Sequence, residues 1–401
     1  MVEEDERVEC EIPTATNEPL NNKPWNVETA GIEIAHQYNE GIRVDNGEPV
    51  QVAVIDSGVT AEHPTFGGRV QVGADLFDAD SQGRCDVDGH GTGVAGIIAG
   101  GSEPDSAYLG VAPQAEIIPI RIFQGSEAGD EVKSRMLAAA ISGAAEAGVE
   151  VINVSIAVLA TPELEEAVAS AIADGVTIVA ATGNASIWMD DESIDANQRA
   201  YYPANYPDVI AVGAHNQSGN WYNETNFGEN LDLLAPGVEI ALPSPNGVDY
   251  RLASGTSFAA PHVAGAAALL WAMYPEQAAD PHWVEQRLRD TAIHPPDDFN
   301  IYQGYGVLNI PNALTAPLED DSESEEPFSE AEPSQIPPID VGFDPLATEK
   351  TIAWASVGGA LVLIILVLVL RKIIPLGRER GWRPGARSGD RLPAKTRDEG
   401  L

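Results

Sequence analysis

Four polar residues of this 401-residue chain are of the types that act together in acyl transfer. Asp56 ends the run VAVID, His90 lies in DGHGTG, Asn184 follows TIVAATG and Ser257 lies in SGTSFAAP. A serine hydroxyl needs an adjacent base, and an imidazole supplies that base near neutral pH. A carboxylate fixes the imidazole tautomer, and an amide N–H stabilises the developing oxyanion. The set predicts hydrolysis of an acyl bond by a serine nucleophile.

Each of these residues, taken alone, has a commoner structural explanation. Asp56 and Asn184 could be turn residues, His90 a hydrogen-bonded structural histidine and Ser257 a plain helix N-cap. Their combination and their glycine neighbours favour the chemical interpretation. We expect Thr256 to cap the helix that follows, which leaves Ser257 free. A proline about one turn into that helix costs the helix little stability, because the first N–H groups of a helix have no intrahelical partner.

The elements that position these residues are predicted from hydrophobic patterns. Residues 46–315 alternate short apolar runs with alanine-rich helical stretches, which indicates βαβ units and a parallel sheet covered on both faces. The predicted strands are 50–55, 115–122, 149–156, 175–181 and 208–214, and the clearest helical patterns are 132–148 and 163–175. In such sheets functional side chains gather beyond the carboxyl ends of the strands.

The order Asp, His, Ser within DSG, GHGT and GTSFAAP resembles the subtilisin-like serine proteases, the subtilases of peptidase type S8. GVAP (110–113), YPANYPDVIAVGA (202–214) and LLAPG (233–237) extend the resemblance over residues 45–315. It implies an α/β fold of three layers, with a mostly parallel sheet between helices. It also implies that Asp56, His90 and Ser257 form the catalytic triad and that Asn184 is the oxyanion donor.

The same resemblance implies a peptide-binding cleft between two segments. One segment is Ser155, Ile156 and Ala157, and the other is Ala181, Thr182 and Gly183. Ala157 stands where the family often has glycine, so the pocket shape is expected to differ there. The implied substrates are proteins or peptides.

The C-terminal part contains a predicted membrane anchor. Residues 351–370, TIAWASVGGALVLIILVLVL, carry no charge, and 20 such residues can cross a bilayer as a helix. Nine basic and four acidic residues follow in 371–401, so residues 1–370 hold 22 − 9 = 13 basic and 62 − 4 = 58 acidic residues. The positive-inside rule places the tail in the cytoplasm and residues 1–350 outside the cell membrane. The acidic exterior excludes nucleic acid as a partner.

The remaining segments complete the predicted organisation. Residues 1–45 carry few helix or strand signals and are expected to be an extension, and the Pro/Glu/Asp/Ser composition of 316–350 predicts a disordered tether. The acidic start MVEEDERVEC is no signal peptide, so we infer that the export signal lies outside this sequence. Cys10 and Cys85 could pair in an exported domain or be unrelated thiols.

This architecture resembles the mycosins, the membrane-anchored subtilases of type VII secretion systems. The shared features are the short extension, a cysteine ahead of His90 in RCDVDGHGT, the ending GYGVLNIPNAL (304–314), the acidic tether and the C-terminal span. The resemblance implies a Cys10–Cys85 disulfide beside the active site and partners among secretion-complex membrane proteins. The alternatives are a general cell-surface subtilase and a mainly structural component of a secretion complex.

No cofactor or metal is predicted. DADSQG (78–83) begins like a calcium-binding loop, but Gln82 and Gly89 stand at the fifth and twelfth positions, and the twelfth needs a glutamate. His262 follows Ser257 by five residues and is expected to pack within the helix.

Overall fold

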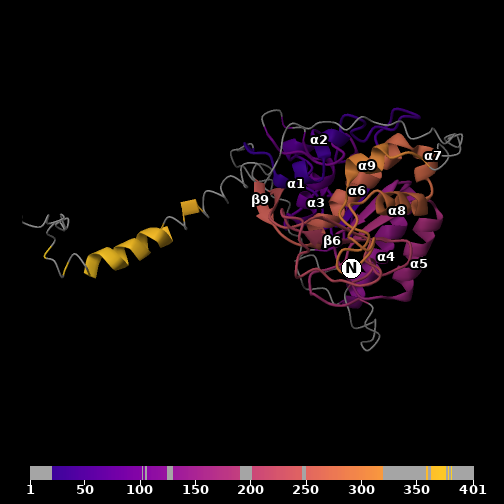
Figure 1. Ribbon diagram of the computed structural model, residues 1–401. Helices are drawn as coiled ribbons and strands as arrows, with labels where there is room; N and C mark the ends of the chain where they lie inside the picture. The colour runs from indigo at the N-terminus through magenta and orange to yellow at the C-terminus, as the bar shows by residue number, and fades with distance from the viewer. Residues whose placement is uncertain are drawn as a thin grey trace, which may run out of the picture. The chain divides into compact units, whose positions relative to one another are not determined.

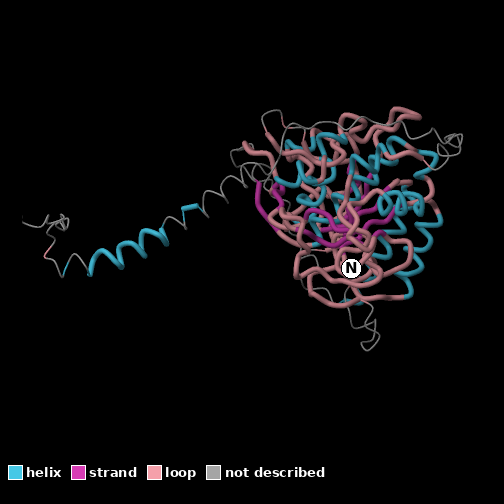
Figure 2. Tube along the Cα trace, in the orientation of Figure 1, coloured by secondary structure: helices cyan, strands magenta, loops and turns pink. Residues whose placement is uncertain are grey.

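The computed structural model describes residues 20–101, 103, 106–123, 130–189, 201–245, 250–318, 358–359, 363–375, 378 and 381 (Figures 1 and 2). The chain divides into two compact units, Met1–Ser322 and Glu323–Leu401. The first unit contains the sheet and every residue predicted to take part in chemistry.

A seven-stranded sheet with all neighbouring strands parallel forms the centre of the first unit. Its order is β2-β3-β1-β4-β5-β6-β7. The strands are β1 (Gln51–Asp56), β2 (Ala74–Asp75), β3 (Glu116–Arg121), β4 (Val151–Val154), β5 (Thr177–Ala181), β6 (Ile210–His215) and β7 (Leu233–Pro236). The five predicted strands are confirmed as β1, β3, β4, β5 and β6. The edge strand β2 and strand β7 were not predicted as strands.

Helices cover both faces of this sheet, as the βαβ pattern predicts. Alternate residues of β1 enter different cores: Val52 and Val54 pack on one face, and Ala53 and Ile55 on the other. The first face is covered by α3 (His90–Ala99) and α6 (Thr256–Met273). The second is covered by α4 (Asp130–Ala147) and α5 (Pro162–Ala173), which lie side by side in Figure 1. The predicted helices 132–148 and 163–175 are therefore confirmed.

Part of the predicted N-terminal extension belongs to the folded unit. Residues 25–29 and 32–35 form the short helices α1 (Trp25–Thr29) and α2 (Ile32–Ala35). Val27, Ile32 and Ala35 are buried in the core that α6 also enters. These two helices were not predicted, because the apolar residues of this segment are too few for a periodic signal, although they suffice for docking on the core.

The remaining elements of the first unit are short and lie around the sheet. They are the 3₁₀ helix η2 (Pro64–Phe66), the antiparallel hairpin β8 (Ile240–Pro243) and β9 (Tyr250–Ala253), and the helices α7 (Pro275–Ala278), α8 (Pro281–Asp290) and α9 (Ile310–Thr315). Helix α8 contacts α6, β5 and α9.

The predicted membrane span and its flanking segments fall mostly outside the described residues. Residues 358–359 and 363–375 are helical. Among the residues that the structure describes, no helix has both the length and the apolar character needed to cross a membrane. The predicted tether, 316–350, is described only as far as residue 318.

Candidate active site

Asp56 and His90 are held together at the carboxyl end of β1. The Nδ1 atom of His90 lies 2.8 and 3.0 Å from the two carboxylate oxygens of Asp56. Asp56 is fully buried, whereas the His90 side chain is 21% exposed. A carboxylate accepts only from a protonated Nδ1, so this contact fixes the tautomer and leaves Nε2 as the atom able to accept a proton.

The surroundings of His90 set its proton affinity. Burial favours the neutral ring, but the charge and hydrogen bond of Asp56, with the charges of Asp86 and Asp88, outweigh it and raise the pKa of His90 above 6.5. The rings of Phe123 and Phe258 lie 6.4 and 5.2 Å from the imidazole. The histidine is therefore an oriented base whose charged form is stabilised by carboxylates.

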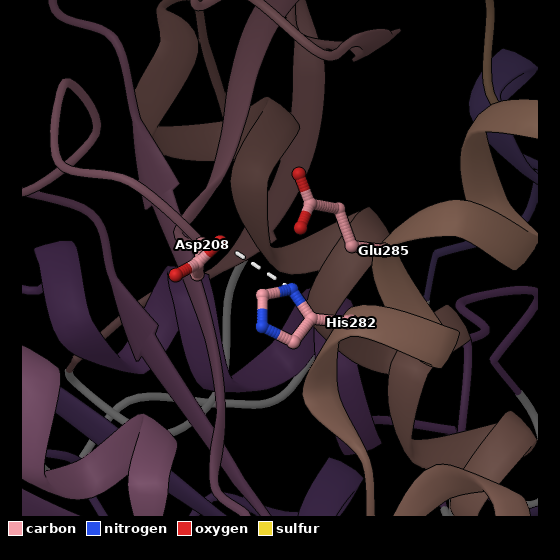
Figure 3. A group of neighbouring side chains, drawn as sticks. All are labelled: Asp208, His282 and Glu285. Atoms are coloured by element: carbon pink, nitrogen blue, oxygen red, sulfur yellow. Dashed lines mark ion pairs between the residues drawn. The ribbon is translucent and has the colours of Figure 1, made fainter.

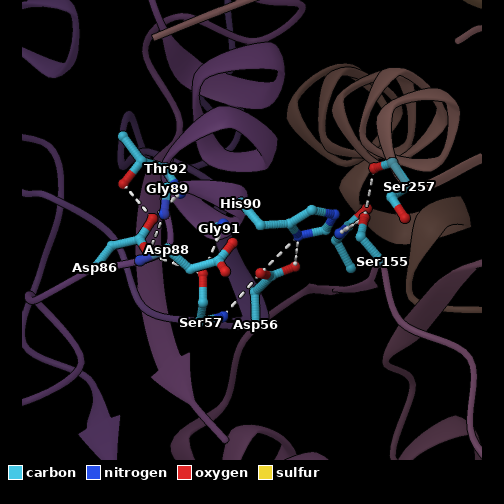
Figure 4. Close-up of polar contacts among 11 residues, drawn as sticks. Asp56, Ser57, Asp86, Asp88, Gly89, His90, Gly91, Thr92, Ser155 and Ser257 are labelled. Carbon is cyan, nitrogen blue, oxygen red and sulfur yellow. Dashed lines mark hydrogen bonds and ion pairs between the residues drawn. The ribbon is translucent and has the colours of Figure 1, made fainter. Parts of the chain in front are cut away.

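Ser257 lies in the first turn of α6, whose local backbone is unusual. Pro261 is inside this helix and has no N–H to donate to the carbonyl of Ser257, four residues earlier. The hydroxyl of Ser155 donates to that carbonyl instead, at 2.8 Å. Figure 4 shows Ser155 and Ser257 beside the His90 ring, with Asp56 on the ring's other side. Within the described residues, the Ser257 hydroxyl makes no hydrogen bond with His90, and such bonds often tighten only when substrate binds.

Asn184 is fastened to the same helix start. Its Oδ1 accepts a 2.8 Å hydrogen bond from the backbone N–H of Thr256, which turns its Nδ2 donor away from that contact. A Cβ atom on Gly255 would lie 3.2 Å from Nδ2, so glycine keeps this approach open. The predicted capping role of Thr256 is wrong: its hydroxyl accepts from the N–H of Gly183 at 3.1 Å, and α6 has no side-chain cap.

A cleft of about 720 Å³ brings the predicted residues together. Its walls include His90, Ser257, Asn184 and five of the six residues predicted to bind substrate: Ser155, Ile156, Ala157, Ala181 and Gly183. Thr182 does not line it. That residue is fully buried, and its carbonyl accepts from Asn226 at 2.7 Å. Asp88, Phe123 and Lys133 also line the cleft, although no sequence pattern indicated them.

Asp86 forms a network beside the Asp56–His90 pair that the sequence analysis missed (Figure 4). Its buried carboxylate accepts from the hydroxyl of Ser57 at 2.9 Å, the N–H of Gly89 at 2.7 Å and the hydroxyl of Thr92 at 2.6 Å. Ser57 directly follows Asp56, while Gly89 directly precedes His90. Burial raises the pKa of Asp86, and these donors oppose that effect. The network ties the end of β1 to the start of α3; the run DVDGHGT was the available signal.

The predicted disulfide involves a residue that is not described. Cys10 lies outside the described residues, whereas Cys85 is buried one residue before Asp86. The Cys10–Cys85 pairing stays a prediction.

A histidine oriented by a buried aspartate lines one cleft together with a serine at a helix start and an amide, which is the arrangement expected of a serine hydrolase. Residues 47–315 match the family model of the subtilases, peptidase S8. The chain belongs to the subtilase family and is a subtilisin-like serine endopeptidase.

Subtilisins are among the proteins whose sequences are similar to this chain. Subtilisin DY from Bacillus licheniformis is 36% identical over 265 residues, which are 66% of this chain and 90% of that protein. Subtilisin E from Bacillus subtilis (strain 168) is 35% identical over 265 residues, and the chain spans 65% of its length.

Solved structures of secretion-system proteases are also similar. MycP1 from Mycobacterium smegmatis has a TM-score of 0.65 and 28% identity, with 78% of this chain and 90% of that chain covered. The MycP3 protease from the type VII (ESX-3) secretion system has a TM-score of 0.63 and 28% identity, with coverages of 75% and 92%.

Proposed function

We propose that the chain is a membrane-anchored mycosin that cleaves protein substrates of a type VII secretion system with Asp56, His90 and Ser257. The observation that carries the catalytic part is that His90, whose Nδ1 contacts the buried Asp56, lines one cleft with Ser257 and Asn184. The similarity to MycP1 and MycP3 supports the setting.

The chemistry follows from this arrangement. His90 Nε2 takes the proton of the Ser257 hydroxyl as Oγ attacks the carbonyl carbon of the scissile peptide bond, and Asp56 stabilises the imidazolium. Asn184 Nδ2 and the N–H groups at the start of α6 stabilise the oxyanion. The imidazolium then gives its proton to the leaving amine, and the C–N bond breaks. Water, deprotonated by His90, hydrolyses the acyl-enzyme and releases Ser257.

The anchor part of the proposal rests on the sequence. Residues 351–370 carry no charge over 20 positions and are followed by a basic tail. As a flexible coil, the 35 residues of the predicted tether, 316–350, would span about 35 Å. The proposed anchor would therefore keep the protease near the bilayer and raise its effective concentration at an export channel.

A comparison of anchored and released protease tests this setting. In cells, a chain that ends at Ser322, exported by the same signal, should process the native secreted substrate much more slowly than the full chain. Both should cleave a short peptide at similar rates in vitro. Equal processing in cells would refute the role of the anchor and favour a general cell-surface subtilase. A Ser257→Ala chain that still supports full secretion would favour a mainly structural role.

A further inference from the structure

A cluster of possible metal ligands lies on the first unit, among residues that do not line the active-site cleft. Asp208 lies in the turn before β6, and His282 and Glu285 lie on α8 (Figure 3). One ligand atom from each of the three side chains lies within 4.8 Å of the other two. Figure 3 shows the imidazole beside the Asp208 carboxylate, with Glu285 on the same helix as His282.

The start of α8 places two of these groups on one face. Glu285 follows His282 by three positions, a spacing that places two side chains on one face of a helix. The carboxylate of Asp280 caps the helix by accepting from the N–H of His282 at 3.1 Å. The Nδ1 atom of His282 lies 3.3 Å from Oδ1 of Asp208. Two ligands of a tetrahedral zinc ion, each about 2.0–2.1 Å from the metal, are separated by roughly this distance.

Among the described residues, the carboxylates at the cluster outnumber the guanidinium groups that contact them. The Glu285 side chain is only 9% exposed, and its Oε1 contacts the guanidinium of Arg289. Arg289 also pairs with the buried carboxylate of Asp232. Within the described part of the chain, no donor contacts the second oxygen of Glu285, Oε2. One guanidinium thus serves two buried carboxylates, and Asp208 adds a third negative charge.

We propose that Asp208, His282 and Glu285 bind a divalent cation of the zinc type. One imidazole nitrogen and two carboxylate oxygens are a ligand set that Zn²⁺ accepts, whereas Ca²⁺ prefers six to eight oxygens. A hollow of about 440 Å³ is lined by Asp208 and His282 but not by Glu285, so water can reach the site from the side of the first two residues. His282 and Asp208 are 59% and 43% exposed, so small side-chain rotations can complete the site.

Such an ion would fasten the turn before β6 to α8. These segments are more than 70 residues apart in the sequence, and the Arg289–Asp232 pair is the buried part of the same junction. A cation that binds only the folded chain stabilises it in proportion to the logarithm of its concentration above Kd. The proposed site is independent of the proteolytic role and of its cellular setting.

Thermal unfolding with added metal tests the site. The full chain, purified in detergent with a tag that contains no histidine, is stripped with EDTA and dialysed. ZnCl₂ at a hundredfold excess over Kd should raise Tm by about 5 °C, with one ion bound per chain. His282→Asn and Asp208→Asn should each abolish this increase in Tm, because each removes one proposed ligand. Both side chains are exposed, so their replacement leaves the core intact. His294→Asn, which changes an exposed histidine elsewhere on the chain, should keep it.

Three results would overturn the proposal. The first is a wild-type Tm that does not respond to ZnCl₂, which would make the cluster an ordinary His–Asp ion pair. The second is an increase that persists in both His282→Asn and Asp208→Asn, which would place the bound ion elsewhere. The third is an increase in Tm that is larger with CaCl₂ than with ZnCl₂ and that His282→Asn and Asp208→Asn abolish, which would refute the assigned ligand chemistry.

Discussion

The hydroxyl of Ser155 donates a 2.8 Å hydrogen bond to the backbone carbonyl of Ser257, and this contact replaces the helical bond that Pro261 cannot make. Ser155 also accepts from the side-chain amide of Asn153 at 2.9 Å. The end of β4 therefore fixes the first turn of α6, on which the proposed nucleophile lies.

Removing the Ser155 hydroxyl should weaken both stability and turnover. Ser155→Ala leaves the Ser257 carbonyl and the Asn153 amide without a partner, which should lower the free energy of unfolding by about 1–3 kcal/mol. Because the first turn of α6 is then less fixed, kcat should fall more than KM rises. Denaturant unfolding and peptide hydrolysis measure the two effects. Ser170→Ala, on the exposed face of α5, is the control and should change neither.

Loss of the Asn184 side chain should affect the transition state more than substrate binding. Asn184→Ala should lower kcat by about 10²–10³-fold with little change in KM, the magnitude known for an oxyanion donor in subtilisin. It also removes the acceptor for the Thr256 N–H, so unfolding must be measured in parallel. A variant that keeps nearly normal kcat would remove Asn184 from the oxyanion role.

The acid limb of the pH profile should have its midpoint above 6.5. Only the neutral imidazole can accept the Ser257 proton, so kcat/KM should rise as pH increases through the pKa of His90, which nearby carboxylates raise. The exposed Asp88 contributes to that increase, and Asp88→Asn should move the midpoint to lower pH. Asp80→Asn, another exposed carboxylate, should leave it in place. A wild-type midpoint below 6.5 would contradict the assigned electrostatics.

His262 should make the fold sensitive to acid. Its Nδ1 donates to the carbonyl of Phe258 at 2.9 Å, and its Nε2 accepts from the amide of Asn26 at 3.0 Å, so the buried ring is neutral. Burial lowers the pKa of His262 to about 3. The unfolded chain then binds more protons, so this contribution is complete above pH 6.5 and is lost as pH falls below it.

The matching experiment compares unfolding at pH 7 and pH 5. Over this interval wild type should lose about 2 kcal/mol more stability than His262→Gln, because glutamine does not titrate. His294→Gln should behave like wild type. An equal loss in wild type and His262→Gln would show that the buried ring is already protonated or takes no part in acid unfolding.

The sequence was enough to predict those structural features that depend on residues close together in the chain. The five strands and two helices were predictable because apolar patterns recur within each segment. The pairing of Asp56 with His90 was predicted from the combination of residue types and from the resemblance of their motifs to those of the subtilases.

Contacts between distant segments that no recognised motif marks could not be predicted. Asp86 contacts Ser57 across 29 positions, and the apolar residues of α1 and α2 are too few for a periodic pattern. Thr256 seemed a helix cap by residue type, yet tertiary contacts direct its hydroxyl to the Gly183 N–H. In each case the contacting residue is distant in the sequence and comes close only in the folded chain.

Labelling with a fluorophosphonate probe tests the nucleophile assignment most directly. The probe forms a stable bond only with a serine that an adjacent base activates. Folded wild-type chain should carry one label, mapped by mass spectrometry to Ser257. Ser257→Ala should carry none, and His90→Ala should react far more slowly. A label on any other serine, or no label on chain that shows a cooperative unfolding transition, would contradict the proposed Asp56–His90–Ser257 mechanism.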